Sequence, residues 1–132
     1  MSDRGALQKL AAAIQIATVS ESDTSRRDHA AFREMRELLR REFPTVHERL
    51  EEHSLSETAI LFRWAGRERE LPPAAMLAHF DVVPPGDPAA WRYPPFSGEL
   101  AEGYLWGRGA VDDKLALITI LQAVEELLSD GF

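Results

Sequence analysis

The sequence predicts an α/β protein in which helices pack against a layered sheet. Amphipathic helical segments lie towards both ends of the chain, and shorter segments of strand character lie between them. One run near the middle is almost continuously apolar, which is typical of a central strand covered on both faces. The 132 residues, 45% of them hydrophobic, suit one domain with a hydrophobic core.

Two amphipathic helices are predicted in the first third of the chain. The first extends from Ala6 to about Ile16, with apolar residues at helical spacing on one face: Leu7, Leu10, Ala11, Ile14 and Ala17. The second extends from about Arg26 to Arg41 after a polar segment, and Pro44 should end it. Its arginines are interleaved with glutamates, so we interpret its polar face as solvated and ion-paired and not as a basic binding patch.

Strands are predicted where the apolar period changes. Thr45 to Leu50 and Ala59 to Trp64 have the composition of strands. Ala74 to Ala78 is the apolar run that we expect to form the central strand of the sheet.

The last third of the chain combines a loop, a hairpin and a helix. A proline-rich loop from Pro84 to Pro95 precedes a short hairpin within Ser97 to Gly107. A helix from Lys114 to Leu128 has apolar residues on most of its surface, so we expect it to be deeply buried. Gly131 suits its C-terminal cap.

Composition excludes several classes of protein. The chain has 15 Lys+Arg and 22 Asp+Glu, and its net charge of −7 argues against nucleic-acid binding, which needs a cationic surface. It has no cysteine, hence no disulfide framework, thiolate zinc site or cysteine nucleophile. The N-terminus lacks the pattern of a signal peptide and no apolar run has the length of a membrane span. We therefore expect a soluble, cytoplasmic protein without a membrane partner.

His79 and Asp81 are the first candidate site residues. They follow the apolar run at positions i and i+2, so their side chains can lie on the same side of an extended chain. An aspartate beside a histidine can fix its tautomer and raise its basicity towards a metal. Ligands of open α/β sheets also collect beyond the carboxyl ends of strands. Because such triplets are frequent by chance, the triplet alone favours the alternative, a solvated His79 with Asp81 capping a turn before Pro84.

Asp112 and Asp113 are the second candidate pair. They follow Gly107 and Gly109 and come immediately before the last helix. Either aspartate could serve only as the N-cap of that helix. A cap needs one carboxylate, however, and the other could act as an oxygen ligand that bridges two cations. The glycine spacing and the negative flanking charge do not fit a phosphate-binding loop.

Several ordered blocks of the sequence resemble the M20 family of metallopeptidases, most closely its carboxypeptidase S and N-acyl-amino-acid hydrolase branch. The resemblance extends from about residue 7 to residue 132. The blocks that carry it are residues 10–20, Ala78–Pro84, Trp91 with Pro94–Gly98, Leu105–Gly109 and Asp112–Lys114.

The resemblance implies a layered helix–sheet–helix catalytic domain of the zinc-exopeptidase type. It implies two Zn²⁺ ions per complete site, with Co²⁺ or Mn²⁺ as possible substitutes, and hydrolysis of an amide bond next to a free carboxylate. By position, His79 would be a metal ligand and Asp112 the bridging metal ligand. Asp81 would be the catalytic aspartate that orients His79, and the Asp112–Asp113 peptide bond would be cis. The implied substrate is a small peptide or an N-acyl-amino acid, and full-length relatives would be homodimers or monomers.

The chain also departs from the family pattern. Family members continue after the last helix to a Glu-Glu pair that provides the general base and a metal ligand, then to further ligands and a dimerisation domain. The sequence ends at Phe132 before these positions. We therefore expect residues 1–132 to be the N-terminal portion of a catalytic domain, with little or no activity alone. Leu115 also stands where many relatives have glycine.

Two further expectations complete the sequence-based interpretation. The alternative function is a non-catalytic α/β binding module that retains relic metal residues, and an exposed apolar face would favour it. The other three histidines are expected to be solvated or structural: His29, His47 and His53.

Overall fold

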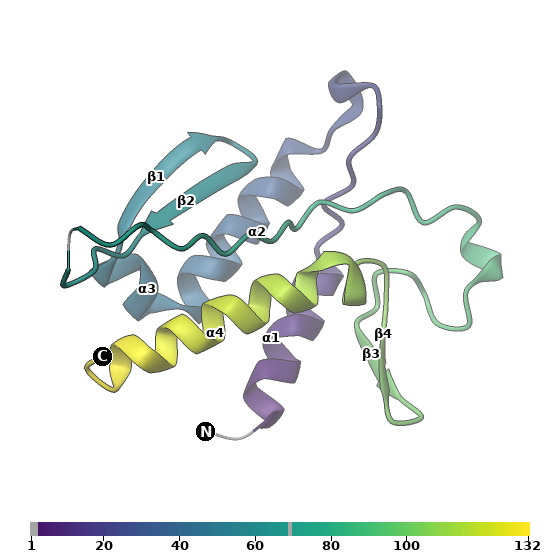
Figure 1. Ribbon diagram of the computed structural model, residues 1–132. Helices are drawn as coiled ribbons and strands as arrows, with labels where there is room; N and C mark the ends of the chain where they lie inside the picture. The colour runs from purple at the N-terminus through teal and green to yellow at the C-terminus, as the bar shows by residue number, and fades with distance from the viewer. Residues whose placement is uncertain (1–2, 69) are drawn as a thin grey trace.

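The computed structural model describes residues 3–68 and 70–132, which contain four α-helices and two small hairpins. The helices are α1 (Asp3–Gln15), α2 (His29–Glu42), α3 (Pro44–Arg49) and α4 (Leu115–Ser129). The strands are β1 (Glu51–Ser56), β2 (Ala59–Arg63), β3 (Glu99–Ala101) and β4 (Tyr104–Trp106). Three short helical turns complete the order: η1 (Thr24–Arg26), η2 (Pro88–Ala90) and η3 (Ala110–Lys114). In Figure 1, α4 crosses α1 and the two hairpins lie on opposite sides of the molecule.

The hydrophobic core lies between the helices. α4 packs against α1 and α3, and α2 packs against the same two helices. The largest fully buried side chains are Ile14, Thr18, Phe32, Met35, Leu39, Phe43, Val46 and Lys114. The helices predicted at residues 6–16, 26–41 and 114–128 are confirmed with shifted ends. α2 begins only at His29 because the Asp28 carboxylate accepts hydrogen bonds from the backbone N–H groups of Ala30 and Ala31 and caps the helix.

α4 is buried on one face and not all round. Its inward face consists of Ile118, Leu121, Val124 and Leu128. Leu115 and Leu127 on the other face are 46% and 41% exposed, so the expectation of a deeply buried helix is only partly right. The predicted cap is confirmed, because Gly131 has φ +81° and its N–H donates to the Leu128 carbonyl.

The strand that the sequence predicts at residues 45–50 is wrong, because residues 45–49 belong to the helix α3. Pro44 begins α3 as its first residue, so it starts a helix as well as following one. Phe43 offers no side-chain cap, and the missing acceptor comes from α4. There the Glu125 carboxylate accepts hydrogen bonds from the N–H groups of Thr45 at 3.0 Å and Val46 at 2.8 Å. The cap lies some 80 residues along the chain, where local patterns cannot indicate it.

The two hairpins account for all the strands among the described residues. β2 and the β3–β4 hairpin agree with prediction. β1 was not predicted because its sequence is polar, and it pairs antiparallel with β2 on the protein surface. Glu52 of β1 forms ion pairs with Arg36 and Arg40 of α2, at 3.5 and 3.1 Å. The polar face of α2 is therefore ion-paired, as expected, although these partners come from a strand.

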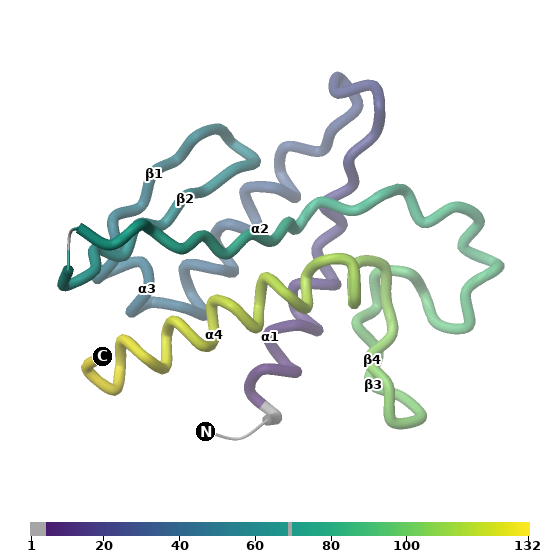
Figure 2. The backbone as a smooth tube through the Cα atoms, viewed as in Figure 1, coloured from purple at the N-terminus to yellow at the C-terminus, as the bar shows by residue number. Residues whose placement is uncertain are grey.

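The predicted central strand at residues 74–78 is wrong. The segment is extended, but it pairs with no strand among the described residues. Met76 and Leu77 are 69% and 85% exposed, so the apolar run is not covered on both faces. Figure 2 shows this segment as an extended tube, and its residues line a groove together with β2 and α4. A sheet ladder needs a hydrogen-bonded neighbouring strand, and the β1–β2 sheet does not extend to this segment. The structure thus contains mainly helices, with a small content of strand.

None of the helices in the described part of the chain has both the length and the apolar character needed to cross a bilayer.

Candidate metal site

The segment that carries His79 is held by the residues that follow α1. The Val82 N–H donates to the Thr18 carbonyl, and the Ser20 N–H donates to the Val82 carbonyl, both at 2.9 Å. These bonds form an isolated parallel bridge between Val19 and Val82. The Thr18 hydroxyl, fully buried, donates to the Phe80 carbonyl. Phe80 and Val82 are buried, which leaves His79 and Asp81 directed towards the surface.

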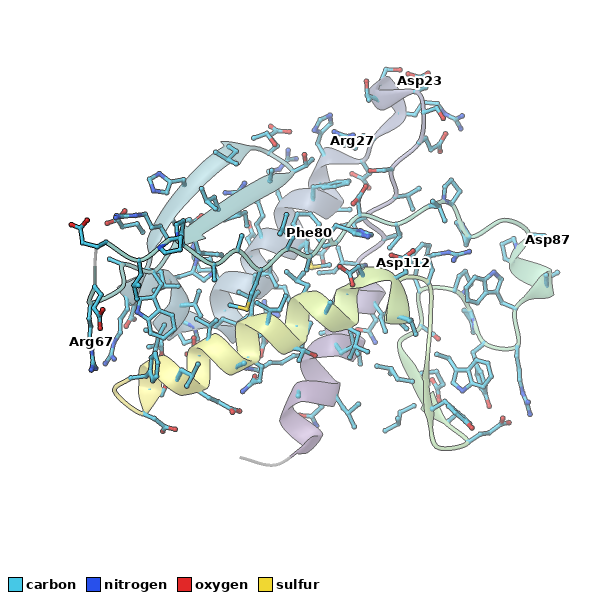
Figure 3. The ribbon with its side chains drawn as sticks, viewed as in Figure 1. Asp23, Arg27, Arg67, Phe80, Asp87 and Asp112 are labelled. Carbon is cyan, nitrogen blue, oxygen red and sulfur yellow. The ribbon has the colours of Figure 1, made fainter. Side chains whose placement is uncertain are left out.

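His79 lies between two aspartates. Its Nδ1 is 3.0 Å from the carbonyl oxygen of Asp81 and 3.3 Å from the Asp81 carboxylate. Its Nε2 is 3.1 Å from Oδ1 of Asp112, so the two nitrogens of the ring have different partners. Figure 3 shows Asp112 in the turn just before α4, close to the segment that contains Phe80. The structure thus brings together all three residues singled out in the sequence.

These partners determine the proton affinity of His79. Burial lowers the pKa of His79, but the hydrogen bond and charge of Asp81, followed by those of Asp112, outweigh it. The pKa therefore lies above the ordinary value of 6.5. A ring with Nδ1 committed to Asp81 presents Nε2 towards Asp112, and a cation can replace the proton there.

Neither aspartate of the second pair caps α4, which has no side-chain hydrogen bond at its N-cap. Asp113 instead accepts a hydrogen bond from the backbone N–H of His79, at 3.2 Å from its Oδ2. Asp112 remains 90% exposed at its side chain and faces the histidine ring. The peptide bond between the two aspartates is cis, as the resemblance implies. The alternative in which these carboxylates serve only as helix caps is therefore wrong.

The donor set fits a zinc ion in part. An imidazole nitrogen and a carboxylate oxygen are both ordinary zinc ligands, and here they face each other. Within residues 3–68 and 70–132, however, no group of three or more His, Asp or Glu side chains is close enough together to hold a metal. A zinc site built on His79 and Asp112 would therefore need at least one more protein ligand.

A cavity of about 310 Å³ opens beside this pair. Ser20 and Arg108 line it with His79, Asp81 and Asp112, and sequence reasoning assigned no role to the first two. The Arg108 guanidinium lies over the Trp91 ring, 5.1 Å from its centroid. Arg108 lies between Gly107 and Gly109, which the sequence analysis singled out. A positive side chain between two glycines was the signal that could have pointed to it.

The remaining histidines have structural or surface roles, in agreement with prediction. His47 is 7% exposed at its side chain, contacts Glu52 at 2.9 Å, and packs edge-on against Phe62. His29 and His53 are half-exposed beside glutamates of the β1–β2 region.

Comparison with known proteins gives a consistent result. Residues 75–132 match peptidase family M20/M25/M40. The whole chain is 38% identical over 134 residues to a probable carboxypeptidase S-like protein of Dictyostelium discoideum, 26% of which is covered. It is 41% identical over 127 residues, 95% of the chain, to an N-fatty-acyl-amino acid synthase/hydrolase of Xenopus tropicalis, of which 24% is covered. It is 34% identical over 135 residues, 96% of the chain, to carboxypeptidase S of Saccharomyces cerevisiae, of which 23% is covered.

The chain thus spans about a quarter of the length of these relatives. The matched family segment includes His79, Asp81 and Asp112, which the structure brings into one cluster. The chain belongs to peptidase family M20.

Proposed function

We propose that this chain provides the first part of the active site of a zinc-dependent hydrolase. In this proposal His79 and Asp112 are metal ligands, and Asp81 orients the His79 ring through Nδ1. The observation that carries the proposal is the arrangement of the ring, with Nδ1 directed to Asp81 and Nε2 at 3.1 Å from the Asp112 carboxylate. An imidazole that is oriented by a carboxylate on one nitrogen and free to bind a metal on the other is a recurrent feature of zinc sites.

The reaction that we propose is hydrolysis of an amide or peptide bond next to a free carboxylate. Bound zinc ions, or Co²⁺ or Mn²⁺ in their place, would supply Lewis acidity towards a water and the scissile carbonyl. The protein's part is to hold His79 in one tautomer and to release its Nε2 proton when the cation binds. Asp112 has two carboxylate oxygens at an exposed position, which suits a ligand shared by two cations.

The proposed substrates are small peptides and N-acyl-amino acids. Relatives named carboxypeptidase S and N-fatty-acyl-amino acid synthase/hydrolase support this class of substrate. We further propose that residues 1–132 form the N-terminal portion of a catalytic domain. Cytoplasmic location stays a prediction.

An exposed apolar segment favours the alternative, a non-catalytic binding module. Met76 and Leu77 are largely exposed beside a groove of about 570 Å³. The same exposure is expected of a catalytic portion that packs against further structure in a longer protein. Metal binding distinguishes the two functions, because a relic site need not retain it.

Calorimetric titration of the 132-residue chain with zinc tests the proposal. We expect measurable binding in the wild type and its loss in both His79→Ala and Asp112→Ala. His53→Ala is a matched control, because His53 is an exposed histidine beside a carboxylate in β1. If the wild type and all three variants bind zinc equally weakly, the metal site proposed here does not exist in this chain.

Activity provides a second, independent measurement. We expect no detectable hydrolysis of N-acyl-amino acids by the zinc-loaded chain, because the described residues bring no third metal ligand to His79 and Asp112. Sustained hydrolysis that disappears in Asp112→Ala would contradict the view that these residues are only part of a site.

A further inference from the structure

We propose that Lys114 is a positioning residue, which fixes the turn carrying Asp112 to the C-terminal end of α1. The inference rests on the proposed metal site and concerns how its two donors are kept in register. Lys114 does not touch the cavity, because its side chain is fully buried. Its action on the site must therefore pass through the backbone of the turn.

The Lys114 ammonium group is bound by backbone carbonyls at the C-terminal end of α1. Nζ donates to the carbonyl oxygens of Ala13 and Ile16, both at 2.8 Å. Ala13 lies in the last turn of α1 and Ile16 directly follows the helix. Each carbonyl also accepts a backbone N–H, that of Ala13 from Ile16 at 3.4 Å and that of Ile16 from Thr18 at 2.9 Å. The C-terminal end of a helix also carries a partial negative charge that favours a cation. No carboxylate pairs with Lys114 in the described part of the chain, so these contacts replace an ion pair.

Burial of an ammonium group is unfavourable unless its donors are satisfied. A lysine that only filled space could be replaced by an apolar side chain of similar length. Lys114 instead directs its charge into the protein, to residues about 100 positions earlier in the chain. The geometry is that of a tether between α1 and the turn before α4.

The other half of the site is attached to the same place. Thr18, two residues beyond Ile16, binds the Phe80 carbonyl through its hydroxyl and the Val82 N–H through its carbonyl. Residues 13–18 therefore hold the His79 segment on one side and the Asp112 turn on the other. The 3.1 Å distance between His79 Nε2 and Asp112 Oδ1 is therefore measured between two segments that are both bound to residues 13–18.

Gly109 shows how closely the turn packs against its neighbours. It has φ +84°, and a Cβ there would lie 2.6 Å from Cγ1 of Val82 and 3.3 Å from Cδ of Lys114. The Lys114 N–H also donates to the Gly109 carbonyl at 3.1 Å. At Gly109 the turn thus packs both against the aliphatic part of Lys114 and against Val82, in the segment that carries His79.

The test uses Lys114→Met, which keeps the length of the stem and removes the donors. Two quantities are measured in the 132-residue chain: zinc affinity by calorimetry, and the His79 ring ¹⁵N signals in the metal-free protein at one fixed pH. We expect zinc affinity to fall by about tenfold or more, as for loss of other groups that orient metal ligands. We expect the His79 Nε2 signal to move towards its position in Asp112→Ala, because the contact between the two side chains is loosened.

Val124→Ala controls for loss of stability. Val124 is a buried residue of the same helix, and it does not line the cavity at the site. We expect this variant to unfold more easily but to retain the wild-type zinc affinity and His79 spectrum. If Val124→Ala changes both readouts as Lys114→Met does, or if Lys114→Met changes neither, the positioning role is refuted.

Lys114→Gln provides the test if the Met variant does not fold. Glutamine keeps an N–H donor on a stem one atom shorter, so it should reach only one of the two carbonyls. We expect a smaller loss of zinc affinity and a His79 shift in the same direction, and no change in either would refute the proposal. If the wild type binds no zinc, the proposed function fails, whereas the metal-free His79 spectra still decide the role of Lys114.

Discussion

Glu125 of α4 provides the N-terminal cap of α3, and its removal should destabilise the fold measurably. Its two carboxylate oxygens accept hydrogen bonds from the backbone N–H groups of Thr45 and Val46, at 3.0 and 2.8 Å. Pro44, the first residue of α3, has no N–H, and Phe43 makes no side-chain cap. The Glu125 carboxylate is thus the side-chain acceptor for the start of this helix.

The expected cost of Glu125→Ala follows from these two bonds. Hydrogen bonds to charged groups contribute about 1.5–3 kcal/mol each, but Glu125 is only half-buried, so water can reach part of the vacated site. Replacement of an N-cap side chain by alanine costs about 0.5–2 kcal/mol, and we expect about 1–2 kcal/mol here. With an unfolding entropy of about 2.1 cal/mol/K per residue, each kcal/mol lowers the Tm of a 132-residue chain by about 4 °C.

The effect should depend on pH. Burial raises the pKa of Glu125, but the hydrogen bonds from Thr45 and Val46 and the charge of Lys9 outweigh it, so the pKa lies below 4.5. A group whose pKa is depressed by folding stabilises the protein above its unfolded pKa. That contribution is lost as the pH falls through the folded value. The stability difference between wild type and Glu125→Ala should therefore be full at pH 6 and shrink below pH 4.5.

Urea denaturation followed by circular dichroism measures this difference, with Glu126→Ala as the control. Glu126 is adjacent and exposed, and among the described residues its carboxylate accepts a hydrogen bond only from the Gln122 amide. We expect the control to cost less than about 0.5 kcal/mol. An equal loss in both variants, or a Glu125→Ala effect that does not change between pH 6 and pH 3, would refute the reasoning.

Two further predictions concern the site. In the metal-free chain, Asp81 and Asp112 outweigh burial and raise the pKa of His79, so Asp112→Asn should lower it in an NMR titration; a wild-type value at or below 6.5 would contradict this. Because the pKa is raised by folding, that interaction stabilises the fold below pH 6.5 and is lost as the pH rises through the folded value. Gly109→Ala should cost about 2–4 kcal/mol of stability, because its φ is positive and a Cβ would overlap with Val82. Gly86→Ala has a similar φ but open space around it, so it should cost only about 1–2 kcal/mol. Equal losses of stability in thermal melts of the two variants would exclude the overlap.

Local chemistry made part of the fold predictable. α4 shows helical spacing of its buried face, and the β3–β4 hairpin is closed by a local turn, so both follow from nearby residues. α3 was mistaken for a strand because its cap comes from Glu125 on a distant helix. Residues 74–78 have the apolar pattern of a central strand, yet the strands that would pair with them are absent from the described part of the chain. Whether a strand is buried depends on the segments that pack around it, and the apolar run alone does not show which segments these are.

The cluster of His79, Asp81 and Asp112 could be predicted from the sequence, whereas the residues that support it could not. The two motifs alone left structural alternatives open, and the resemblance singled out these three positions. Thr18 and Lys114 are ordinary surface residues in most sequences, so pattern alone gives no reason to single them out. Their burial is what reveals them, since both are fully enclosed and bonded to backbone atoms from other segments.

The sequence around Lys114 gives no indication of its buried position. A cation at the beginning of a helix opposes the helix dipole, so a lysine just before α4 is locally unfavourable. The same ammonium group lies at the C-terminal end of α1, where the dipole favours it and two carbonyl oxygens accept hydrogen bonds from it. The unfavourable local position is thus compensated by a second helix, and the compensation exists only when α1 and the Asp112 turn are in contact. A residue that is favourable only when these parts are in contact connects the folding of α1 to the geometry of the His79–Asp112 pair.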